Sequence, residues 1–306
     1  MDVTVMITSR NRCEVLRRTL LRLSQMNPPP KEILITADGC TDETAVMVQQ
    51  NFSHCQLTIN SSGLGSIASR DHMLRRATGE LVLSLDDDSY PLDDDFFARL
   101  PILFEAHPEA SVITFPELRD GGGFANSSQS PDSEGHYVSA YANAVAAMRR
   151  SFYLKSPGFP GMFFHCYEEP DYALQSYGQK RGVWFEPSMV IRHHYTSVNR
   201  SELKNHHYNA RNELWSVWIR CPLPWVFPVS FYRIVRQLLH SATQGPLWIA
   251  KEPVWWWSAL KGLGRCLQLR SPIAWPTYFR WMRLARNPIH HVSDFREKFG
   301  LATEIA

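Results

Sequence analysis

Three consecutive aspartates, Asp86-Asp87-Asp88, directly follow an apolar run at Glu80–Leu85. Adjacent carboxylates repel one another, so the arrangement costs free energy unless a cation neutralises it. Because alternate residues at a strand end point the same way, Asp86 and Asp88 can share one hard cation, with a diphosphate completing its shell. The alternative is a solvated acidic turn that caps a helix. The apolar run before the triplet and the aromatic-proline step Ser89-Tyr90-Pro91 after it favour the metal site.

A second acidic cluster, Glu168-Glu169-Pro170-Asp171, follows a Gly- and aromatic-rich segment. A carboxylate held beside a pocket can act as a general base. The alternative is the first turn of a helix, where the helix dipole favours acidic side chains. These residues alone leave both interpretations open.

Two adjacent histidines, His193 and His194, end the apolar segment 187–192. A histidine at a strand end in an acidic domain can be a metal ligand, although a lone histidine is more often structural. His206-His207 lies on a predicted helix without a matching acidic residue, and His290-His291 lies near the end of the chain, so we interpret both pairs as structural.

Short β-branched runs alternate with amphipathic stretches over the first half of the chain. This alternation predicts βαβ units and an α/β fold with a mostly parallel mixed central sheet. The expected strands are 3–8, 33–35, 56–59, 80–85 and 111–115, and the expected helices are 14–26, 43–51, 67–77 and 96–106. Ligands of open α/β sheets bind at the carboxyl ends of the strands, which is where the polar residues gather after Thr8, at Asp38 and at Asp86. We expect Thr41 or Asp42 to cap the second helix and the run Asp93-Asp94-Asp95 to cap the fourth.

The 306-residue chain has a net charge of +2 that conceals a strong asymmetry. Residues 1–199 carry 17 basic and 24 acidic side chains, whereas residues 200–306 carry 15 and 6 and include nine of the ten Trp. We therefore predict two domains, an acidic catalytic domain at 1–200 and a basic, Trp-rich, helical region at 201–306 made of short helices. An acidic domain with the best-patterned motifs argues against a nucleic-acid partner.

The six cysteines form no CxxC pair, which is typical of a reduced, cytoplasmic chain rather than a zinc or redox site. The N-terminus has no signal-peptide pattern, and no run of 18 or more apolar residues predicts a spanning helix.

Taken in order, the motifs resemble those of family 2 glycosyltransferases, including their polysaccharide-type and rhamnosyltransferase-like members. The resemblance covers roughly residues 3–215. Its motifs are VTVMITSRNR at 3–12, DGCTD at 38–42, LDDD at 85–88, EEPD at 168–171, the strand and histidine at 190–193, and NARNEL at 209–214. The resemblance implies a GT-A fold and transfer of a sugar from a nucleotide-diphosphate donor.

The resemblance also implies roles for individual residues. Thr8 and Asp38 would hold the nucleobase, and Arg12 or Arg70 the nucleotide. The nucleotide-sugar site would also include Asp87, and Asp86 would contact the ribose or the sugar. The divalent ion, Mg²⁺ or Mn²⁺, would be bound by Asp88 and His193. The general base would be Glu169, with Asp171 as the alternative.

These roles describe an inverting enzyme that acts on a hydroxyl of a glycan or lipid-linked acceptor in cell-envelope polysaccharide or glycoconjugate synthesis. A divalent cation stabilises the charge of the departing nucleotide diphosphate, and one carboxylate deprotonates the acceptor. A glycoside hydrolase also uses two carboxylates but needs neither a nucleotide loop nor a metal triad. The remaining alternatives are a nucleotidylyltransferase, whose Gly-rich phosphate loop is missing from Ser9-Arg10-Asn11-Arg12, and a non-catalytic sugar-binding scaffold of the envelope.

The Trp-rich region offers a further hypothesis. Trp favours the membrane interface and basic residues favour anionic lipid, so residues 201–306 are expected to dock the enzyme peripherally on the cytoplasmic membrane face. The alternative is that these Trp side chains only pack helices onto the catalytic domain.

Overall fold

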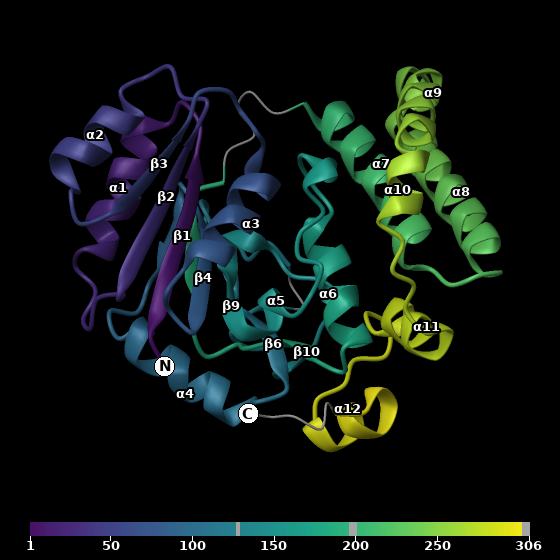
Figure 1. Ribbon diagram of the computed structural model, residues 1–306. Coiled ribbons are helices and arrows are strands. Elements are labelled where there is room, and N and C mark those ends of the chain that lie inside the picture. The colour runs from purple at the N-terminus through teal and green to yellow at the C-terminus, as the bar shows by residue number, and fades with distance from the viewer. Residues whose placement is uncertain (127–128, 196–200, 302–306) are drawn as a thin grey trace.

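A mixed eight-stranded sheet forms the centre of the computed structural model, which describes residues 1–126, 129–195 and 201–301 (Figure 1). Its strands are β1 (Val3–Ser9), β2 (Glu32–Asp38), β3 (Gln56–Asn60), β4 (Leu81–Asp86), β6 (Ala110–Thr114), β8 (His136–Tyr137), β9 (Ala146–Arg149) and β10 (Gly182–Phe185). Their order is β3-β2-β1-β4-β9-β6-β10-β8. The first four of these are parallel neighbours, whereas β9 runs antiparallel to both β4 and β6. The predicted α/β fold with a mostly parallel mixed sheet is confirmed.

The first strands are buried on both faces because helices cover the sheet. In β1, Val5, Met6 and Ile7 are all fully buried, as expected for a continuous apolar run in a parallel sheet. The covering helices are α1 (Cys13–Leu23), α2 (Thr44–Asn51), α3 (Ser66–Arg76), α4 (Phe96–Ala106) and α5 (Arg150–Leu154). Figure 1 shows α3 in front of the sheet, where it contacts β1 and β2.

A separate three-stranded sheet brings distant segments to the end of β4. Its strands are β5 (Ser89–Pro91), β11 (Ile191–His193) and β7 (Glu117–Arg119), in the order β5-β11-β7. Antiparallel pairing places His193 opposite Ser89, directly after the aspartate triplet. Parallel pairing with β7 brings Glu117 to the same site.

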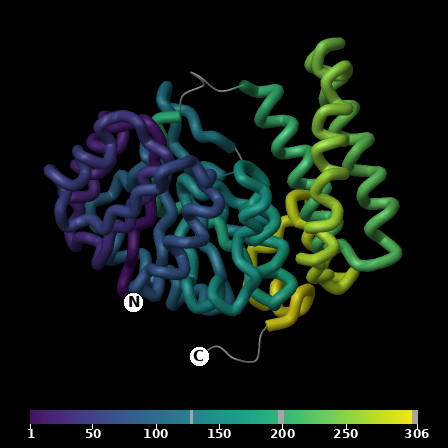
Figure 2. The backbone as a smooth tube through the Cα atoms, turned by 45° about the horizontal axis from the view of Figure 1, so that its top comes forward, coloured from purple at the N-terminus to yellow at the C-terminus, as the bar shows by residue number. Residues whose placement is uncertain are grey.

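The C-terminal region is a group of helices beside the sheet (Figure 2). It follows α6 (Glu168–Gly178) and contains α7 (Glu202–Arg220), α8 (Val226–Gln244), α9 (Pro246–Lys261), α10 (Leu263–Gln268), α11 (Trp275–Arg283) and α12 (Val292–Phe299). Helix α7 contacts α6 on one side and α8, α9 and α10 on the other. The chain then returns to the sheet, where Tyr137 N donates to Ile289 O at 2.8 Å and Trp281 Nε1 donates to Ser139 O at 2.8 Å. Within the described residues, no helix is both long and apolar enough to cross a membrane.

Three sequence predictions about helices need correction. The C-terminal helices are not all short, because α8 has 19 residues and α9 has 16. Helix α4 begins at Phe96 as predicted, but Asp95 makes no side-chain cap. The aspartates of that run instead pair with arginines, Asp93 with Arg99 and Asp94 with Arg22.

Neither Thr41 nor Asp42 is the N-cap of α2, which is Glu43 without a side-chain cap, although Asp42 Oδ1 accepts from Thr44 N, the first residue of the helix, at 3.1 Å. The predicted domain boundary at residue 200 lies outside the described residues and stays a prediction.

Candidate active site

The carboxyl ends of β1, β2 and β4 open into one cavity of about 850 Å³. That volume suits a small-molecule ligand. Of the predicted site residues, the cavity is lined by Thr8, Arg12, Asp38, Arg70, Asp86, Asp87 and Glu169. Helix α7 and the segment before α6 form its opposite wall, through residues such as Tyr208 and Phe164. The fold therefore brings together motifs from Thr8 to Asn209, 201 residues apart in the sequence.

Asp86, Asp88 and His193 form a cluster with the geometry of a metal site. One ligand atom from each lies within 4.8 Å of the others. His193 Nε2 is 3.0 Å from Asp88 Oδ1 and 3.7 Å from Asp86 Oδ2. Both Asp88 Oδ1 and His193 Nε2 are buried, and apart from their contact with each other and the 3.7 Å approach of Asp86 neither has a partner among the described residues. Two buried ligand atoms that face each other fit a divalent cation, and the oxygen and imidazole donors suit Mn²⁺ well.

Glu117 supports this cluster from behind, and the sequence analysis did not identify it. Its Oε1 lies 2.9 Å from His193 Nδ1, the arrangement that commonly orients a metal-binding imidazole. Burial lowers the pKa of His193, but the neighbouring carboxylates of Asp88 and Glu117 outweigh it and raise the pKa to about 9. The sequence signal that could have identified Glu117 was its position just beyond the expected strand 111–115.

His194 is committed to other partners. Its Nε2 lies 2.8 Å from the Tyr90 hydroxyl and its Nδ1 lies 2.8 Å from Asp120 Oδ1. Of the two adjacent histidines, only His193 faces Asp86 and Asp88.

Arg12, which is partly exposed, and the buried Asp87 form a scaffold beside the cluster. Arg12 donates to Asp87 Oδ1 and to Asp88 Oδ2, both at 2.7 Å. Ser9 Oγ donates to the other Asp87 oxygen at 2.8 Å. Burial raises the pKa of Asp87 to about 7 despite Arg12. In contrast, His193 and Arg12 overcome the burial of Asp88 and lower its pKa to about 2. Asp88 is therefore charged at neutral pH.

Asp38 orders the loop that follows β3. Its Oδ1 accepts from Asn60 Nδ2 at 2.8 Å and from Leu64 N at 2.9 Å, and its Oδ2 accepts from Gly65 N at 2.9 Å. The buried carboxylate of Asp38 thus accepts three hydrogen bonds and fixes the loop that forms the cavity wall. Thr8 is less buried and lies opposite Asp86 in the sheet register.

Arg70 links the metal cluster to the second acidic cluster. Its guanidinium donates to Asp86 Oδ1 and lies 3.7 Å from Glu168 Oε1. The side chain is 5% exposed, and its Nε has no hydrogen-bond partner among the described residues. A buried guanidinium between two carboxylates is well placed to meet a phosphate or a sugar hydroxyl.

Glu168 and Glu169 begin α6 and face the same cavity. Burial, followed by repulsion from Glu169, raises the pKa of Glu168 to about 8. Burial also raises the pKa of Glu169, while backbone donors and the Arg70 charge lower it. The pair therefore retains one proton near neutral pH, held by Glu168, and Glu169 ionises first. Asn143 positions both carboxylates, through N to Glu169 Oε1 at 3.4 Å and Nδ2 to Glu168 Oε1 at 3.1 Å.

Asp171 lies outside the cavity, which argues against its use as the alternative base. It is fully buried and forms an ion pair with Arg220 Nη2 at 3.0 Å. It also accepts hydrogen bonds from Ser216 Oγ and Gln175 Nε2, both at 2.7 Å. Because α6 turns by about 200° over two residues, Asp171 points toward α7 while Glu169 points into the cavity.

Comparison with known proteins supports the same assignment of fold. A family model described as glycosyl transferase family 2 matches residues 4–168. A curated relative, poly-beta-1,6-N-acetyl-D-glucosamine synthase of Staphylococcus epidermidis, is 24% identical over 155 residues. That match covers 49% of this chain and 35% of the relative, so the alignment spans about a third of the length of the relative.

Solved structures resemble nearly the whole chain. The mannosyltransferase PcManGT of Pyrobaculum calidifontis, in complex with GDP-Man and Mn²⁺, has a TM-score of 0.57 and 18% identity, covering 92% of this chain and 84% of its own. Residues 1–349 of S. aureus TarS, in complex with UDP-GlcNAc, have a TM-score of 0.61 and 15% identity, covering 88% and 84%. GalNAc-T7 with UDP, GalNAc and Mn²⁺ has a TM-score of 0.63 and 13% identity, covering 98% and 58%. In another TarS structure, the matched part is 40% of that chain. At these identities the likeness establishes the shared fold.

Proposed function

The chain belongs to glycosyl transferase family 2, and from that premise we propose that it transfers a sugar from a nucleotide-diphosphate donor to a hydroxyl of a glycan or lipid-linked acceptor. The observation that carries this proposal is that one cavity joins three groups of residues. Asp86 of the metal cluster lines the cavity, Arg70 lies between Asp86 and Glu168, and Glu168 and Glu169 line the cavity beyond Arg70. A metal-bound diphosphate, a transferred sugar and an acceptor hydroxyl would be bound by these groups in that order.

The donor half of the cavity has an interior suited to a polyanion. Asp86, Asp88 and His193 would hold Mg²⁺ or Mn²⁺, which when bound neutralises the charge that develops on the leaving diphosphate. Thr8 and the loop ordered by Asp38 would bind the nucleobase. Arg12 and Asp87 act as positioning residues, since Arg12 holds Asp88 and Asp87 holds Arg12. Arg70 would contact the diphosphate or the sugar.

Glu169 is the proposed general base. It is the member of the acidic pair that ionises first, and Asn143 fixes its position. A single carboxylate opposite the leaving group supports a single displacement with inversion at the anomeric carbon. Asp171 is proposed to hold α6 against α7 through Arg220.

By its name the curated relative makes poly-beta-1,6-N-acetyl-D-glucosamine, which supports a role for this chain in polysaccharide or glycoconjugate synthesis. A panel of nucleotide sugars tests the activity, with UDP-GlcNAc and GDP-mannose first because structural neighbours bind them. We expect metal-dependent release of a nucleoside diphosphate from one donor, and loss of that release in Asp88→Ala. Release of pyrophosphate from a nucleoside triphosphate and a sugar phosphate would instead identify a nucleotidylyltransferase. No turnover of any donor that binds would favour the non-catalytic scaffold.

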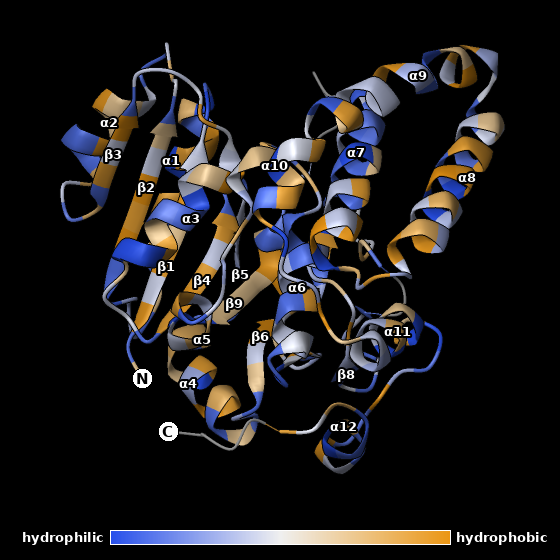
Figure 3. Ribbon diagram, turned by 45° about the vertical axis from the view of Figure 1, so that its right-hand side comes forward, coloured by the Kyte–Doolittle hydropathy of each residue, from blue (hydrophilic) through white to orange (hydrophobic). Residues whose placement is uncertain are grey.

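We also propose that the helices at 201–306 hold the enzyme on an anionic membrane surface, on the cytoplasmic face. The Trp residues divide into two groups, since Trp255 is 1% exposed whereas Trp257 is 62% exposed. Apolar residues recur along α8 and α9, which lie at the edge of the molecule away from the sheet (Figure 3). The large exposed ones are Phe227, Phe231, Tyr232, Leu239, Leu247, Ile249, Val254, Trp257 and Leu260.

The surrounding charge favours anionic lipid over a protein partner. Residues 214–293 contain ten Lys and Arg but one acidic residue, Glu252, which is buried beside His206. A helix pair with an apolar outer side and only basic exposed charges is suited to the interface of an anionic bilayer.

Vesicle co-sedimentation tests the membrane proposal. Binding to phosphatidylglycerol-containing vesicles should weaken with salt and fall in Phe231→Ser and Trp257→Ser. Ile102→Ser, which removes an equally exposed side chain from α4, is the matched control. Vesicle binding by the two α8–α9 variants equal to that of the control, or a dimer that forms through α8 and α9 and binds no vesicle, would contradict the proposal.

A further inference from the structure

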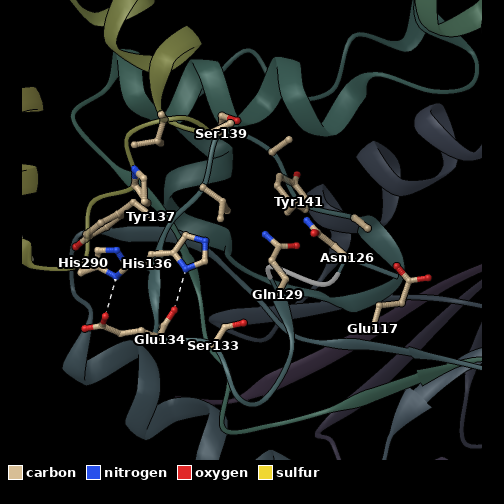
Figure 4. A pocket seen from close by; sticks show the side chains of 16 residues that line it. Glu117, Asn126, Gln129, Ser133, Glu134, His136, Tyr137, Ser139, Tyr141 and His290 are labelled. Carbon is tan, nitrogen blue, oxygen red and sulfur yellow. Dashed lines mark hydrogen bonds and ion pairs between the residues drawn. The ribbon is translucent and has the colours of Figure 1, made fainter. Parts of the chain in front are cut away.

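A second cavity of about 600 Å³ lies between the segment that contains β7 and β8 and the end of the C-terminal region (Figure 4). Glu117, Ser133, Glu134, His136 and the segment 137–142 form one side. The segment 284–290 forms the other, through side chains such as Leu284, Pro288 and His290. In the view of Figure 4, His136 and His290 lie at one end beside Glu134, and Glu117 lies at the other.

This second cavity adjoins the active site. Ala142 lines both cavities, and the next residue, Asn143, donates to Glu169. At the same end, Glu117 lines the second cavity while its carboxylate holds His193 of the metal cluster. A ligand in the second cavity would therefore have one end near the proposed base and the metal.

Tyr141 carries a polar group that the protein leaves unsatisfied. Its side chain lines the second cavity and is 8% exposed, yet its hydroxyl has no hydrogen-bond partner among the described residues. Burial raises the pKa of this hydroxyl well above 10, and the neighbouring Tyr172, Glu169 and Glu168 raise it further. A buried hydroxyl without a partner is unfavourable, and a ligand hydroxyl could satisfy it.

The two cavities differ in charge, and the difference indicates the ligand. The active-site cavity has four basic lining residues, Arg10, Arg12, Arg70 and Lys204, as a diphosphate requires. Among the described residues that line the second cavity there is no Lys or Arg. Its polar groups are carboxylates, hydroxyls, imidazoles and side-chain amides, and Tyr137 and Tyr141 add aromatic rings. Such a surface suits the hydroxyls and the apolar faces of neutral sugar rings and lacks the Lys or Arg side chains that would neutralise a phosphate.

We propose that the second cavity binds a neutral saccharide portion of the acceptor, with the reacting hydroxyl directed past Tyr141 and Ala142 toward Glu169. This inference rests on the proposed transferase function. It assigns the C-terminal region a part in acceptor recognition, because Ile289 pairs with Tyr137 and Trp281 donates to Ser139 to close the cavity wall.

Saccharide binding measured by saturation-transfer NMR and calorimetry tests the inference. The probes are neutral tetrasaccharides: β-1,6-linked N-acetylglucosamine, cellotetraose and a mannotetraose. Ala285→Trp places a bulky side chain in the cavity wall from an exposed position, and Ala98→Trp on α4 is the matched control. Tyr141→Phe removes only the unpartnered hydroxyl.

At least one probe should bind the wild type and Ala98→Trp equally. Ala285→Trp should abolish that binding, and Tyr141→Phe should weaken it by about threefold to tenfold, the value of one hydrogen bond. Probe binding that is unchanged in both cavity variants would overturn the inference, as would a wild type that binds UDP or GDP with Mn²⁺ but none of the probes. Failure of the wild type to bind any nucleotide with metal would contradict the transferase function itself, so the two failures are distinguishable.

Discussion

Replacing Glu169 with Gln tests whether Glu169, rather than Glu168, is the general base. The amide keeps the shape of the carboxylate and its contact with the backbone N–H of Asn143, but it cannot accept the acceptor proton. General-base catalysis contributes about 10²–10⁴-fold in rate, so turnover of Glu169→Gln should fall by that factor. Nucleotide affinity should persist, because the metal cluster is untouched.

Glu168→Gln should behave differently for a reason that the structure supplies. Burial and repulsion from Glu169 raise the pKa of Glu168, so this side chain stays protonated at neutral pH, and Gln resembles that neutral form. Glu168→Gln should therefore keep most of its turnover at neutral pH. It should also lose any change in rate that the wild type shows at alkaline pH, when Glu168 ionises.

The pH dependence of turnover follows from the direction in which the pKa of Glu169 is shifted. A base works when deprotonated, and the pKa of Glu169 is raised above the ordinary glutamate value. Wild-type turnover should thus fall as the pH drops through that raised pKa, at a higher pH than an exposed glutamate would give. The Glu168→Gln profile should keep this acidic limb, and the residual rate of Glu169→Gln should lack it.

Nucleoside diphosphate release, measured from pH 5 to 9 with saturating Mn²⁺, gives all three profiles, and calorimetry with the nucleotide checks that each variant retains its donor site. An inactive Glu168→Gln together with an active Glu169→Gln would refute the reasoning, because it would make Glu168 the base. Equal losses in both variants would show that the pair acts as one unit.

Three further predictions concern the metal, the buried ion pair and the donor loop. Asp88→Ala should abolish transfer and weaken Mn²⁺-dependent nucleotide binding. Because a metal must displace the His193 proton, the Mn²⁺ affinity of the wild type, measured by calorimetry, should rise about tenfold per pH unit up to pH 9. An Mn²⁺ affinity independent of pH would exclude His193 as a ligand. Asp171→Asn should lower the free energy of unfolding by about 3–5 kcal/mol in a denaturant titration, since it leaves the buried guanidinium of Arg220 unpaired. Asp2→Asn, which removes an exposed ion pair, should change the free energy of unfolding little. Equally small effects of the two variants would contradict the role of Asp171 in a buried ion pair. Gly39→Ala should lower nucleotide affinity. Gly39 has a φ of +67°, and a Cβ there would lie only 2.5 Å from the backbone nitrogen of Gly63, so the substitution would displace the loop after β3. Unchanged affinity would show that this loop does not contact the nucleotide.

The sequence was sufficient for the order of elements and for the edge of the sheet that carries the site. Short apolar, β-branched runs that alternate with amphipathic stretches indicate buried strands, and polar residues that follow such strands lie at the carboxyl edge of a parallel sheet. For this reason Asp38, Asp86 and Asp88 could be placed before any coordinates. The resemblance of ordered motifs added His193, which no local pattern separates from His194.

Tertiary structure alone decided which polar groups remain free. Asp171 and Glu169 are two residues apart in one acidic cluster, but helical rotation pairs the first with Arg220 and leaves the second facing the cavity. Glu117 joins the metal cluster through pairing between β7 and β11, a contact across 76 residues. The Trp side chains divided between core and surface for the same reason, since burial depends on which helix faces which neighbour. Sequence spacing specifies the period of an element, and only packing specifies what lies opposite it.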